Sequence, residues 1–505
     1  MLELKDITIQ LKKDGRMLAE SFSFTLGKGD KAVIIGEEGN GKSTLLKAVY
    51  DPSLVEGYCE FSGLVTARGR LAYLPQLMEG HLAAMSLGEY FEDTEYYRHP
   101  EVPDSLGLRP EFFFGTQKLG SLSGGEKVKA QLARLLLGEP DVLLLDEPTN
   151  DLDLPTLRWL EAFLRDTRLP VLYISHDETL IENTANVILH MEQLIRKTRC
   201  RITVTREDYR SYLARRRQSF DHQAQVARKQ RDEHEKQQRR WQQIYDRVDH
   251  EQRSISRQNP SGGRLLKKKM HSVIATGKRL ERETEDFVEF PEEEEAILTF
   301  FDPAVRLPSG KTVLDWSCPQ LTVGERVLAR DLSLRVAGPA AVGITGRNGV
   351  GKSTLLRALW EELRLRRDLR AAYMPQDYAE VLDYARTPLE HLSAVYAKET
   401  LTRARSCLGS MRFTHEEMTG KIAALSGGQR AKLLLLDMVL QGANVLLLDE
   451  PTRNFSPLSA PVVRAALREF GGAIISVSHD RKYLSEVCTA VYELTPEGLR
   501  RTEAP

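Results

Sequence analysis

The sequence contains little of what marks a secreted, metal-binding or membrane-embedded chain. Its five cysteines are scattered singly among 505 residues, and no CxxC pair suggests a zinc site. We therefore expect free thiols in a reducing compartment. No run approaches the ~18 apolar residues that span a bilayer. The opening residues, MLELKDITIQL, alternate like a strand and lack a signal-peptide pattern. These absences predict a cytoplasmic protein. The length of 505 residues and the ordinary globular composition predict about two to four domains with a sizeable core.

The chain also has almost no net charge, but the total of −1 conceals an asymmetry. The segment from Tyr209 to Leu280 contains 19 Lys and Arg against 7 Asp and Glu, an excess of 12 positive charges. The remaining residues therefore carry an excess of 13 negative charges. A basic middle between acidic flanks indicates an anionic partner for that middle.

Four motifs occur twice in the same order, which indicates a duplicated domain. They are GEEGNGKST and GRNGVGKST, LSGGE and LSGGQ, LLLDEPT in both copies, and ISHD and VSHD. Three of the pairs share one spacing of 303 residues: Ser123 and Ser426, Asp146 and Asp449, and His176 and His479. We expect two copies of one domain, at about residues 1–205 and 290–505.

The GxxxxGK[ST] motif is a phosphate loop, whose glycines let backbone N–H groups turn inward around an anion. Apolar residues precede each loop and a helix-like stretch follows it, which adds the positive end of a helix dipole. The lysine would reach the β- and γ-phosphates, and the serine hydroxyl would hold Mg²⁺. The candidate residues are Gly36, Gly39, Gly41, Lys42, Ser43 and Thr44, and Gly346, Gly349, Gly351, Lys352, Ser353 and Thr354.

The LLLDEPT motif predicts a buried parallel strand that ends in a carboxylate. Asp146 and Asp449 would bind Mg²⁺, and Glu147 and Glu450 would orient or activate the attacking water. An Asp-Glu pair more often lies in a solvated loop, but three leucines before it and a phosphate loop upstream argue against that alternative. His176 and His479 each follow a short apolar strand, where the repeat favours a γ-phosphate contact over a structural role.

The LSGG motif presents a serine hydroxyl and free backbone N–H groups at an expected helix start, which is a second anion site. The phosphate loop of the same domain already supplies one phosphate cradle. The second cradle makes sense if it closes over nucleotide held by the other domain. The candidates are Ser123, Gly124 and Gly125, and Ser426, Gly427 and Gly428.

Together these motifs, with Gln76 in YLPQ and Gln376 in YMPQ, resemble those of the ATP-binding cassette ATPases. The resemblance implies two cassettes that sandwich two ATP molecules head to tail, with Gln76 and Gln376 at nucleotide and Mg²⁺. One site, here called the Lys42 site, would pair Lys42 with Ser426, Gly427 and Gly428. The other, the Lys352 site, would pair Lys352 with Ser123, Gly124 and Gly125.

The sequence departs from the family pattern at three places. Only aliphatic residues occupy the expected adenine-stacking positions: Leu11, and Leu321 or Val323. The first phosphate loop has Glu38 where the second has Asn348, which adds an acid near bound phosphate; the alternative is that its side chain points away. The segment after DEPT reads NDLDLPT in the first copy and RNFSPLS in the second, so Ser456 replaces Asp153. This change predicts unequal hydrolysis rates at the two sites.

The basic middle is dense in helix-forming residues from about Arg206 to His250, and helix-like sequence resumes at Leu265. Pro260, Gly262 and Gly263 predict a turn between the two stretches. The middle therefore predicts an αα-hairpin at residues 206–289 with a basic tip near residues 257–270. A solvated coiled-coil spacer is the alternative, but the unbalanced charge favours binding to nucleic acid. The candidate RNA-binding residues are Arg253, Arg257, Arg264, Lys267, Lys268 and Lys269.

The complete pattern predicts an α/β fold of two P-loop cassettes joined by a long basic helical hairpin, and it resembles the ABC-F family. That resemblance implies a monomeric, ATP- and Mg²⁺-dependent ATPase that binds the ribosome in its ATP-closed state. The hairpin would reach toward 23S rRNA and the P-site tRNA. Housekeeping translation factors and antibiotic-resistance factors share these motifs, so both remain open. The alternatives are the ATPase subunit of a transporter, a DNA-repair ATPase and a catalytically inactive scaffold.

Overall fold

The computed structural model describes residues 1–150, 152–194, 199–254, 260–283, 287–288, 290, 305–393 and 398–503. The chain forms two compact units, which are Met1–Tyr209 with Glu294–Pro505, and Arg210–Glu293. The first unit contains both cassettes and the second contains the helical hairpin. Within the described residues, no helix combines the length and the apolar character that a bilayer crossing requires.

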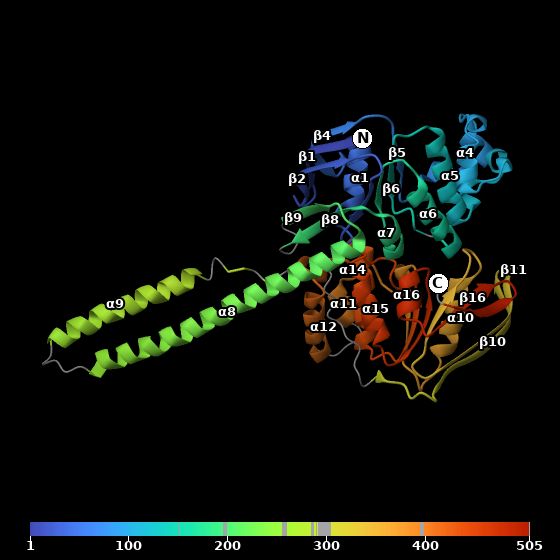
Figure 1. Ribbon diagram of the computed structural model, residues 1–505. Helices are drawn as coiled ribbons and strands as arrows, with labels where there is room; N and C mark the ends of the chain where they lie inside the picture. Colours follow the sequence, from blue (N-terminus) through green and yellow to red (C-terminus); the bar gives the residue numbers. More distant parts are fainter. Residues whose placement is uncertain are drawn as a thin grey trace. The chain divides into compact units, whose positions relative to one another are not determined.

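The first cassette has a six-stranded sheet in the order β5-β6-β7-β3-β8-β9, parallel except for β9. Figure 1 labels four of these strands, β5, β6, β8 and β9. Its central strands are entirely buried, as expected for parallel strands covered on both faces. The strands are β3 (Lys31–Ile35), β5 (Leu71–Leu74), β6 (Val142–Asp146), β7 (Val171–Ile174), β8 (Val187–Leu194) and β9 (Arg199–Thr205).

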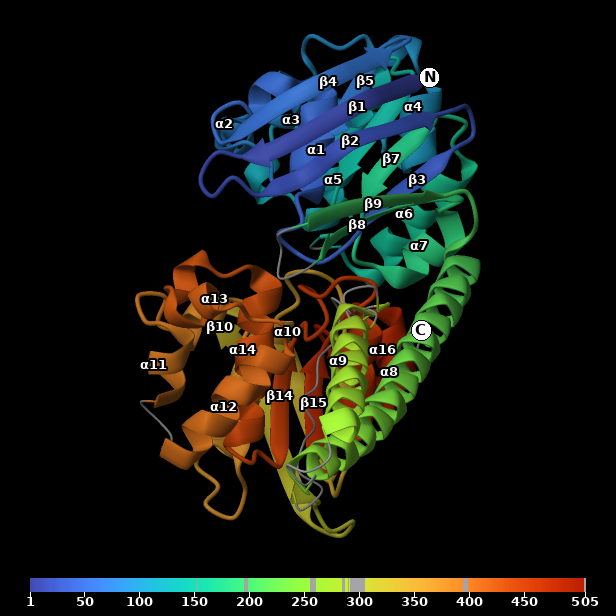
Figure 2. The same cartoon turned by 90° about the vertical axis from the view of Figure 1, so that its left-hand side faces the viewer.

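An antiparallel sheet of β1 (Leu2–Leu11), β2 (Met17–Leu26) and β4 (Cys59–Ala67) forms a second layer (Figure 2). The apolar face of this layer, α1 and β3 contribute to one continuous core. The helices of the cassette are α1 (Lys42–Tyr50), α2 (Gly80–Ala84), α3 (Leu87–Phe91), α4 (Glu101–Leu106), α5 (Gly124–Leu137), α6 (Leu154–Asp166) and α7 (Glu178–Thr184).

The second cassette repeats this plan with the sheet order β13-β14-β15-β12-β16-β17 and the hairpin β10-β11. Its strands are β10 (Thr312–Val323), β11 (Arg326–Ala337), β12 (Ala341–Thr345), β13 (Ala371–Met374), β14 (Val445–Asp449), β15 (Ala473–Val477), β16 (Ala490–Thr495) and β17 (Gly498–Thr502). Its helices are α10 (Lys352–Leu363), α11 (Pro388–Ser393), α12 (Lys398–Ser410), α13 (His415–Thr419), α14 (Gly427–Leu440), α15 (Ala460–Arg468) and α16 (Arg481–Glu486). The twin α/β plan predicted from the repeats is confirmed.

The hairpin consists of α8 (Tyr209–Ser254) and α9 (Pro260–Glu283), which lie side by side in both views (Figures 1 and 2). The indole Nε1 of Trp241 donates a hydrogen bond to the Val273 carbonyl oxygen at 2.7 Å. A side chain at Gly277 would meet the same indole at 2.8 Å. A large ring on α8 therefore packs against a residue without a side chain on α9.

The turn predicted at Pro260, Gly262 and Gly263 is wrong, because these residues belong to the first turn of α9. Proline suits that position, since the N–H it lacks would have no partner within the helix. Residues 255–259 separate the two helices in the sequence. Arg257, one of the predicted RNA-binding residues, lies there, outside the described residues.

Candidate active site

Each phosphate loop leaves a buried strand and opens a helix. Gly41 and Gly351, immediately before α1 and α10, have φ of 92° and 103°, a left-handed conformation that glycine adopts without steric cost. Lys42 and Lys352 begin the helices, and each Nζ donates to the carbonyl oxygen of its loop's first glycine, at 2.8 and 2.9 Å. Ser43 with Thr44, and Ser353 with Thr354, follow in the first turns. Both loops are therefore shaped as cradles for an anion.

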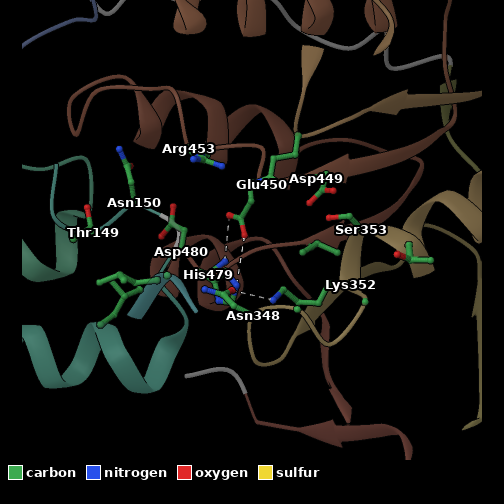
Figure 3. Close-up of a pocket in the computed structure, with 18 of the residues that line it drawn as sticks. Thr149, Asn150, Asn348, Lys352, Ser353, Asp449, Glu450, Arg453, His479 and Asp480 are labelled. Atoms are coloured by element: carbon green, nitrogen blue, oxygen red, sulfur yellow. Dashed lines mark hydrogen bonds and ion pairs between the residues drawn. The ribbon is translucent and has the colours of Figure 1, made fainter. Parts of the chain in front are cut away.

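The Lys352 site is a cavity of about 720 Å³ with walls from both cassettes. Figure 3 shows Thr149 and Asn150 of the first cassette opposite Lys352 and Ser353 of the second. The sequence-predicted residues that line this cavity are Gly124, His176, Gly349, Gly351, Lys352, Ser353, Thr354, Gln376, Asp449, Glu450 and His479. The structure therefore brings the second phosphate loop and the first LSGG motif to one cavity, as the sandwich arrangement requires.

Glu450 follows the end of β14 and has a φ of 53°, a left-handed conformation that is rare outside glycine and marks functional positions. Burial, reinforced by the adjacent Asp449, raises the pKa of Glu450 to about 8. Burial and the nearby Lys352 lower the pKa of His479 to about 3, so the imidazole is neutral. Its Nε2 lies 3.9 Å from Glu450 Oε1. The Glu450 carboxyl is thus not held in a close ion pair.

The corresponding pair at the Lys42 site is closer. His176 Nε2 lies 2.8 Å from Glu147 Oε1, and His176 Nδ1 donates to the Phe455 carbonyl oxygen of the second cassette at 2.8 Å. Burial alone would lower the pKa of His176, but Glu147 raises it above its ordinary value. Glu147 has a φ of 50°, close to the 53° of its counterpart Glu450. The two Glu–His pairs, which match in sequence, therefore differ in the direction of their pKa shifts and in the distance between carboxylate and imidazole.

Asp146 is buried and accepts a hydrogen bond from Ser43 Oγ at 2.8 Å. The hydroxyl of Tyr73 donates to its other carboxylate oxygen at 3.2 Å. Burial raises the pKa of Asp146, and the Ser43 hydrogen bond opposes that rise. Sequence reasoning missed Tyr73, although its place at the start of the YLPQ motif was available as a signal. Gln76, in the same motif, is exposed just after β5.

Ser123 and Ser426 cap α5 and α14, each within a capping box that includes Glu126 or Gln429. Gly124 and Gly125, and Gly427 and Gly428, open the two helices, so their N–H groups form the helix N-termini. At the Lys42 site, however, the N–H of Gly428 donates to the carboxylate of Glu38. Of the two alternatives for Glu38, the structure therefore disfavours the side chain that points away, because the carboxylate accepts a hydrogen bond from the other cassette.

Glu37 was also missed. Its Oε1 accepts hydrogen bonds from Ser456, at 2.6 Å, and from Ser459, and its Oε2 lies 3.8 Å from Lys432 Nζ. All three partners belong to the second cassette. The signal was the pair of acids in GEEGNGKST, which stands where the second loop has Arg347 and Asn348.

Among the residues that the structure describes, no Phe, Tyr or Trp side chain lines the Lys352 cavity. Of the two aliphatic residues predicted near adenine there, Val323 lines the cavity, together with Leu328, whereas Leu321 is buried in the core. Leu11 packs against the core of the first cassette. Adenine would therefore meet aliphatic rather than aromatic surface at the Lys352 site.

Five of the six predicted RNA-binding residues belong to the described part of the hairpin. Arg264, Lys267, Lys268 and Lys269 are exposed near the start of α9. Arg253, near the end of α8, is also exposed and pairs with Asp249 at 2.9 Å. Four predicted RNA-binding cations on α9 are thus available to a ligand.

Comparison with known proteins agrees with this arrangement. A model of the ABC transporter family matches residues 19–150 and 329–453. The energy-dependent translational throttle protein EttA of Escherichia coli (strain K12) is 30% identical over 450 residues, covering 87% of this chain and 72% of that protein. The chain belongs to the ABC-F family of ATP-binding cassette ATPases. The family assignment made from the motifs is confirmed.

Other relatives of this ABC-F protein are similar over much of its length. The putative ATP-binding protein YdiF of Bacillus subtilis (strain 168) is 30% identical over 81% of the chain, which spans 61% of YdiF's length. The probable ATP-binding protein YheS of Escherichia coli (strain K12) is 27% identical over 96% of the chain and 77% of YheS. A chain in the crystal structure of the complex of archaeal ribosomal stalk protein aP1 and archaeal ribosome recycling factor aABCE1 shares the fold. Its TM-score is 0.61 at 17% identity, covering 98% of this chain and 89% of that one.

The residues of this ABC-F protein fit a Mg²⁺ ion at the Lys352 site. Asp449 Oδ2 is buried and has no hydrogen-bond partner among the described residues, a costly state that a cation would relieve. Ser353, which opposes the burial-driven rise in the pKa of Asp449, and Gln376 line the same cavity. These are oxygen ligands of the kind that Mg²⁺ prefers.

Proposed function

We propose that this protein binds ATP with Mg²⁺ at its two composite sites and acts on the ribosome as a translation factor. Lys352 and the backbone of its loop hold the phosphates, and Gly124 at the start of α5 closes over them from the other cassette. Ser353, Asp449 and Gln376 would hold Mg²⁺, which would neutralise charge on the phosphates. Glu450 orients the attacking water, and neutral His479 contacts the γ-phosphate.

The observation that carries the ribosome proposal is the exposed cationic surface of the hairpin. Arg264, Lys267, Lys268 and Lys269 lie within six residues of one helix. Such a surface binds the phosphate backbone of structured RNA by releasing counterions. A transporter subunit would have no use for it. The relative EttA, which is named a translational throttle protein, supports the same partner. We propose that the tip contacts 23S rRNA and the P-site tRNA.

Sedimentation with 70S ribosomes tests the proposal. The Glu147→Gln/Glu450→Gln variant loses both water-orienting carboxylates and should be trapped in its ATP-closed state. We expect it to sediment with ribosomes only when ATP is present. Replacing Lys267, Lys268 and Lys269 with Ala in that background should weaken the binding about 10-fold or more and flatten its dependence on salt.

A matched control removes three exposed cations elsewhere on the hairpin, by Arg228→Ala, Lys229→Ala and Lys236→Ala. These positions lie more than ten residues from the described end of α8, which is at least about 25 Å along the helix. The control should bind nearly as well as the parent. The absence of ATP-dependent sedimentation at modest salt would contradict the ribosome proposal and favour the transporter alternative. If binding is found, drug susceptibility of a strain that expresses the protein separates a resistance factor from a housekeeping one.

A further inference from the structure

The two phosphate loops meet the opposite cassette in different ways. At the Lys42 site the carboxylates of Glu37 and Glu38 both contact the second cassette. At the Lys352 site the equivalent residues are Arg347, which is exposed, and Asn348, which lines the open cavity. The two sites therefore differ between the phosphate loop and the opposite cassette, where an ATP phosphate would bind.

Glu38 occupies a donor that a phosphate would need. Its carboxylate accepts the N–H of Gly428 at the start of α14, where the helix dipole favours an anion. A side chain at Gly427 would meet both carboxylate oxygens of Glu38 at 3.1 Å. The carboxylate therefore lies directly against the LSGG motif. Because the carboxylate carries the same sign of charge as a phosphate, it competes with ATP for this N-terminus.

Glu37 ties the same loop to the second cassette. Its side chain is 13% exposed, and Ser456 and Ser459, which donate to it, are 1% and 0% exposed. Burial alone would raise the pKa of Glu37, but Lys432 and the two hydroxyls bring it below the ordinary value. Glu37 is therefore an anion at neutral pH, held by three partners across the interface.

At the Lys42 site the acid, Glu37, belongs to the phosphate loop, and its partner Ser456 follows DEPT in the other cassette. At the Lys352 site the acid is on the opposite side of the interface. There the carboxylate is Asp153, four residues after DEPT in the first cassette; its pKa is lowered mainly by Thr156 and also by the backbone of Asn348 in the second phosphate loop. In the second cassette the matching residue is Ser456, and the carboxylate comes instead from Glu37 in the first phosphate loop. The second cassette thus has Ser456 where the first has the acid Asp153, and the first phosphate loop has the acid Glu37 where the second has Arg347.

We propose that the first phosphate loop blocks its own ATP site: Glu38 holds the Gly428 N–H and Glu37 anchors the loop, so ATP enters the Lys42 site only after displacing Glu38. The Lys42 site is then the weaker nucleotide site, and the Lys352 site exchanges nucleotide freely. This inference rests on the ATP-binding part of the proposed function and is independent of the ribosome.

Equilibrium dialysis of the full-length chain with radiolabelled ATP and Mg²⁺ tests the proposal. Lys352→Ala removes binding at the Lys352 site, so that the remaining Kd belongs to the Lys42 site. Adding Glu38→Asn, which installs the residue of the second loop, should lower that Kd about 10-fold or more, because one charge-assisted competitor is lost. Glu38→Gln should act in the same direction. An unchanged or higher Kd would overturn the proposal.

The reciprocal change keeps the test decisive if the Glu38 variants do not fold. In a Lys42→Ala background, Asn348→Glu should raise the Kd of the Lys352 site about 10-fold or more, and an unchanged Kd contradicts the proposal. Glu60→Gln, an exposed acid on β4, is the control for overall charge. If it lowers the Kd as much as Glu38→Asn does, the effect is nonspecific and the proposal is wrong. Failure of ATP to bind the unsubstituted chain would instead contradict the proposed function.

Discussion

Arg464 of the second cassette and Glu178 of the first form a buried ion pair, with Arg464 Nη1 2.6 Å from Glu178 Oε1. The two side chains are 3% and 4% exposed. Glu486 also accepts from Arg464 at 2.8 Å, and Lys482 Nζ lies 3.0 Å from Glu178. The cassettes are thus joined by buried, hydrogen-bonded charges next to the Lys352 cavity, since Arg464 also lies 4.0 Å from Asp480, which lines that cavity.

Arg464→Ala should destabilise the protein strongly, by about 3–5 kcal/mol, because Glu178 loses its main partner while still buried. Urea unfolding measures the change. The control is Arg335→Ala, which removes a surface pair with Asp315 at 4.0 Å, both side chains being more than two-thirds exposed; it should cost at most about 1 kcal/mol. Similar losses for the two variants would mean that the buried pair contributes nothing special.

The two catalytic glutamates should not be equivalent. Glu450→Gln should lower the steady-state ATPase rate by about 100-fold or more, as expected for loss of a general base. Glu147→Gln should lower it less than about 10-fold, because Glu147 is held by His176 at a site blocked by Glu38. Single-turnover rates of the two variants decide this. Equal residual rates of ATP hydrolysis in the two variants would contradict the predicted difference between the two sites.

Gly277→Ala should loosen the hairpin. The new methyl group would lie 2.8 Å from the Trp241 indole, and overpacking of this kind costs about 1–3 kcal/mol. Hydrogen–deuterium exchange of α8 and α9 amides in the full-length chain should become faster. Ser272→Ala, at an exposed position of the same helix, should leave the exchange unchanged. Adding Trp241→Ala to Gly277→Ala should remove the clash without restoring the lost packing.

Ser456→Asp should weaken the interface at the Lys42 site, because it places a second carboxylate against Glu37. The Glu37→Gln/Ser456→Asp double variant should recover part of the loss. A double-mutant cycle measured by urea unfolding should give a coupling of about 1–3 kcal/mol. Purely additive effects would show that the two positions do not interact.

Local pattern was enough to predict much of the molecule. Phosphate loops, capped LSGG helices and buried LLLD strands each depend on neighbours within a few residues, so the sequence alone predicts them. The hairpin was predicted for the same reason, since helix propensity is local. Its turn was misplaced because proline and glycine near a helix start look like a turn in sequence.

Contacts between the cassettes could not be predicted in this way. Gly428 and Glu38 are 390 residues apart, Ser456 and Glu37 are 419 apart, and Arg464 and Glu178 are 286 apart. Each depends on how two folded surfaces meet. Glu37 and Glu38 of the first phosphate loop can be identified in the sequence, but their hydrogen-bond partners in the second cassette cannot.

The sequence by itself determined that this protein has two ATP-binding cassettes, which residues form the phosphate loops, and that a basic helical segment joins them. These features follow from short-range geometry and from a repeat in register. Only the tertiary structure decided that Glu37 and Glu38 face the second cassette while Arg347 and Asn348 leave an open cavity. A carboxylate accepts hydrogen bonds from whichever donors lie near it. Only folding brings the hydroxyls of Ser456 and Ser459 to Glu37 and the Gly428 N–H to Glu38.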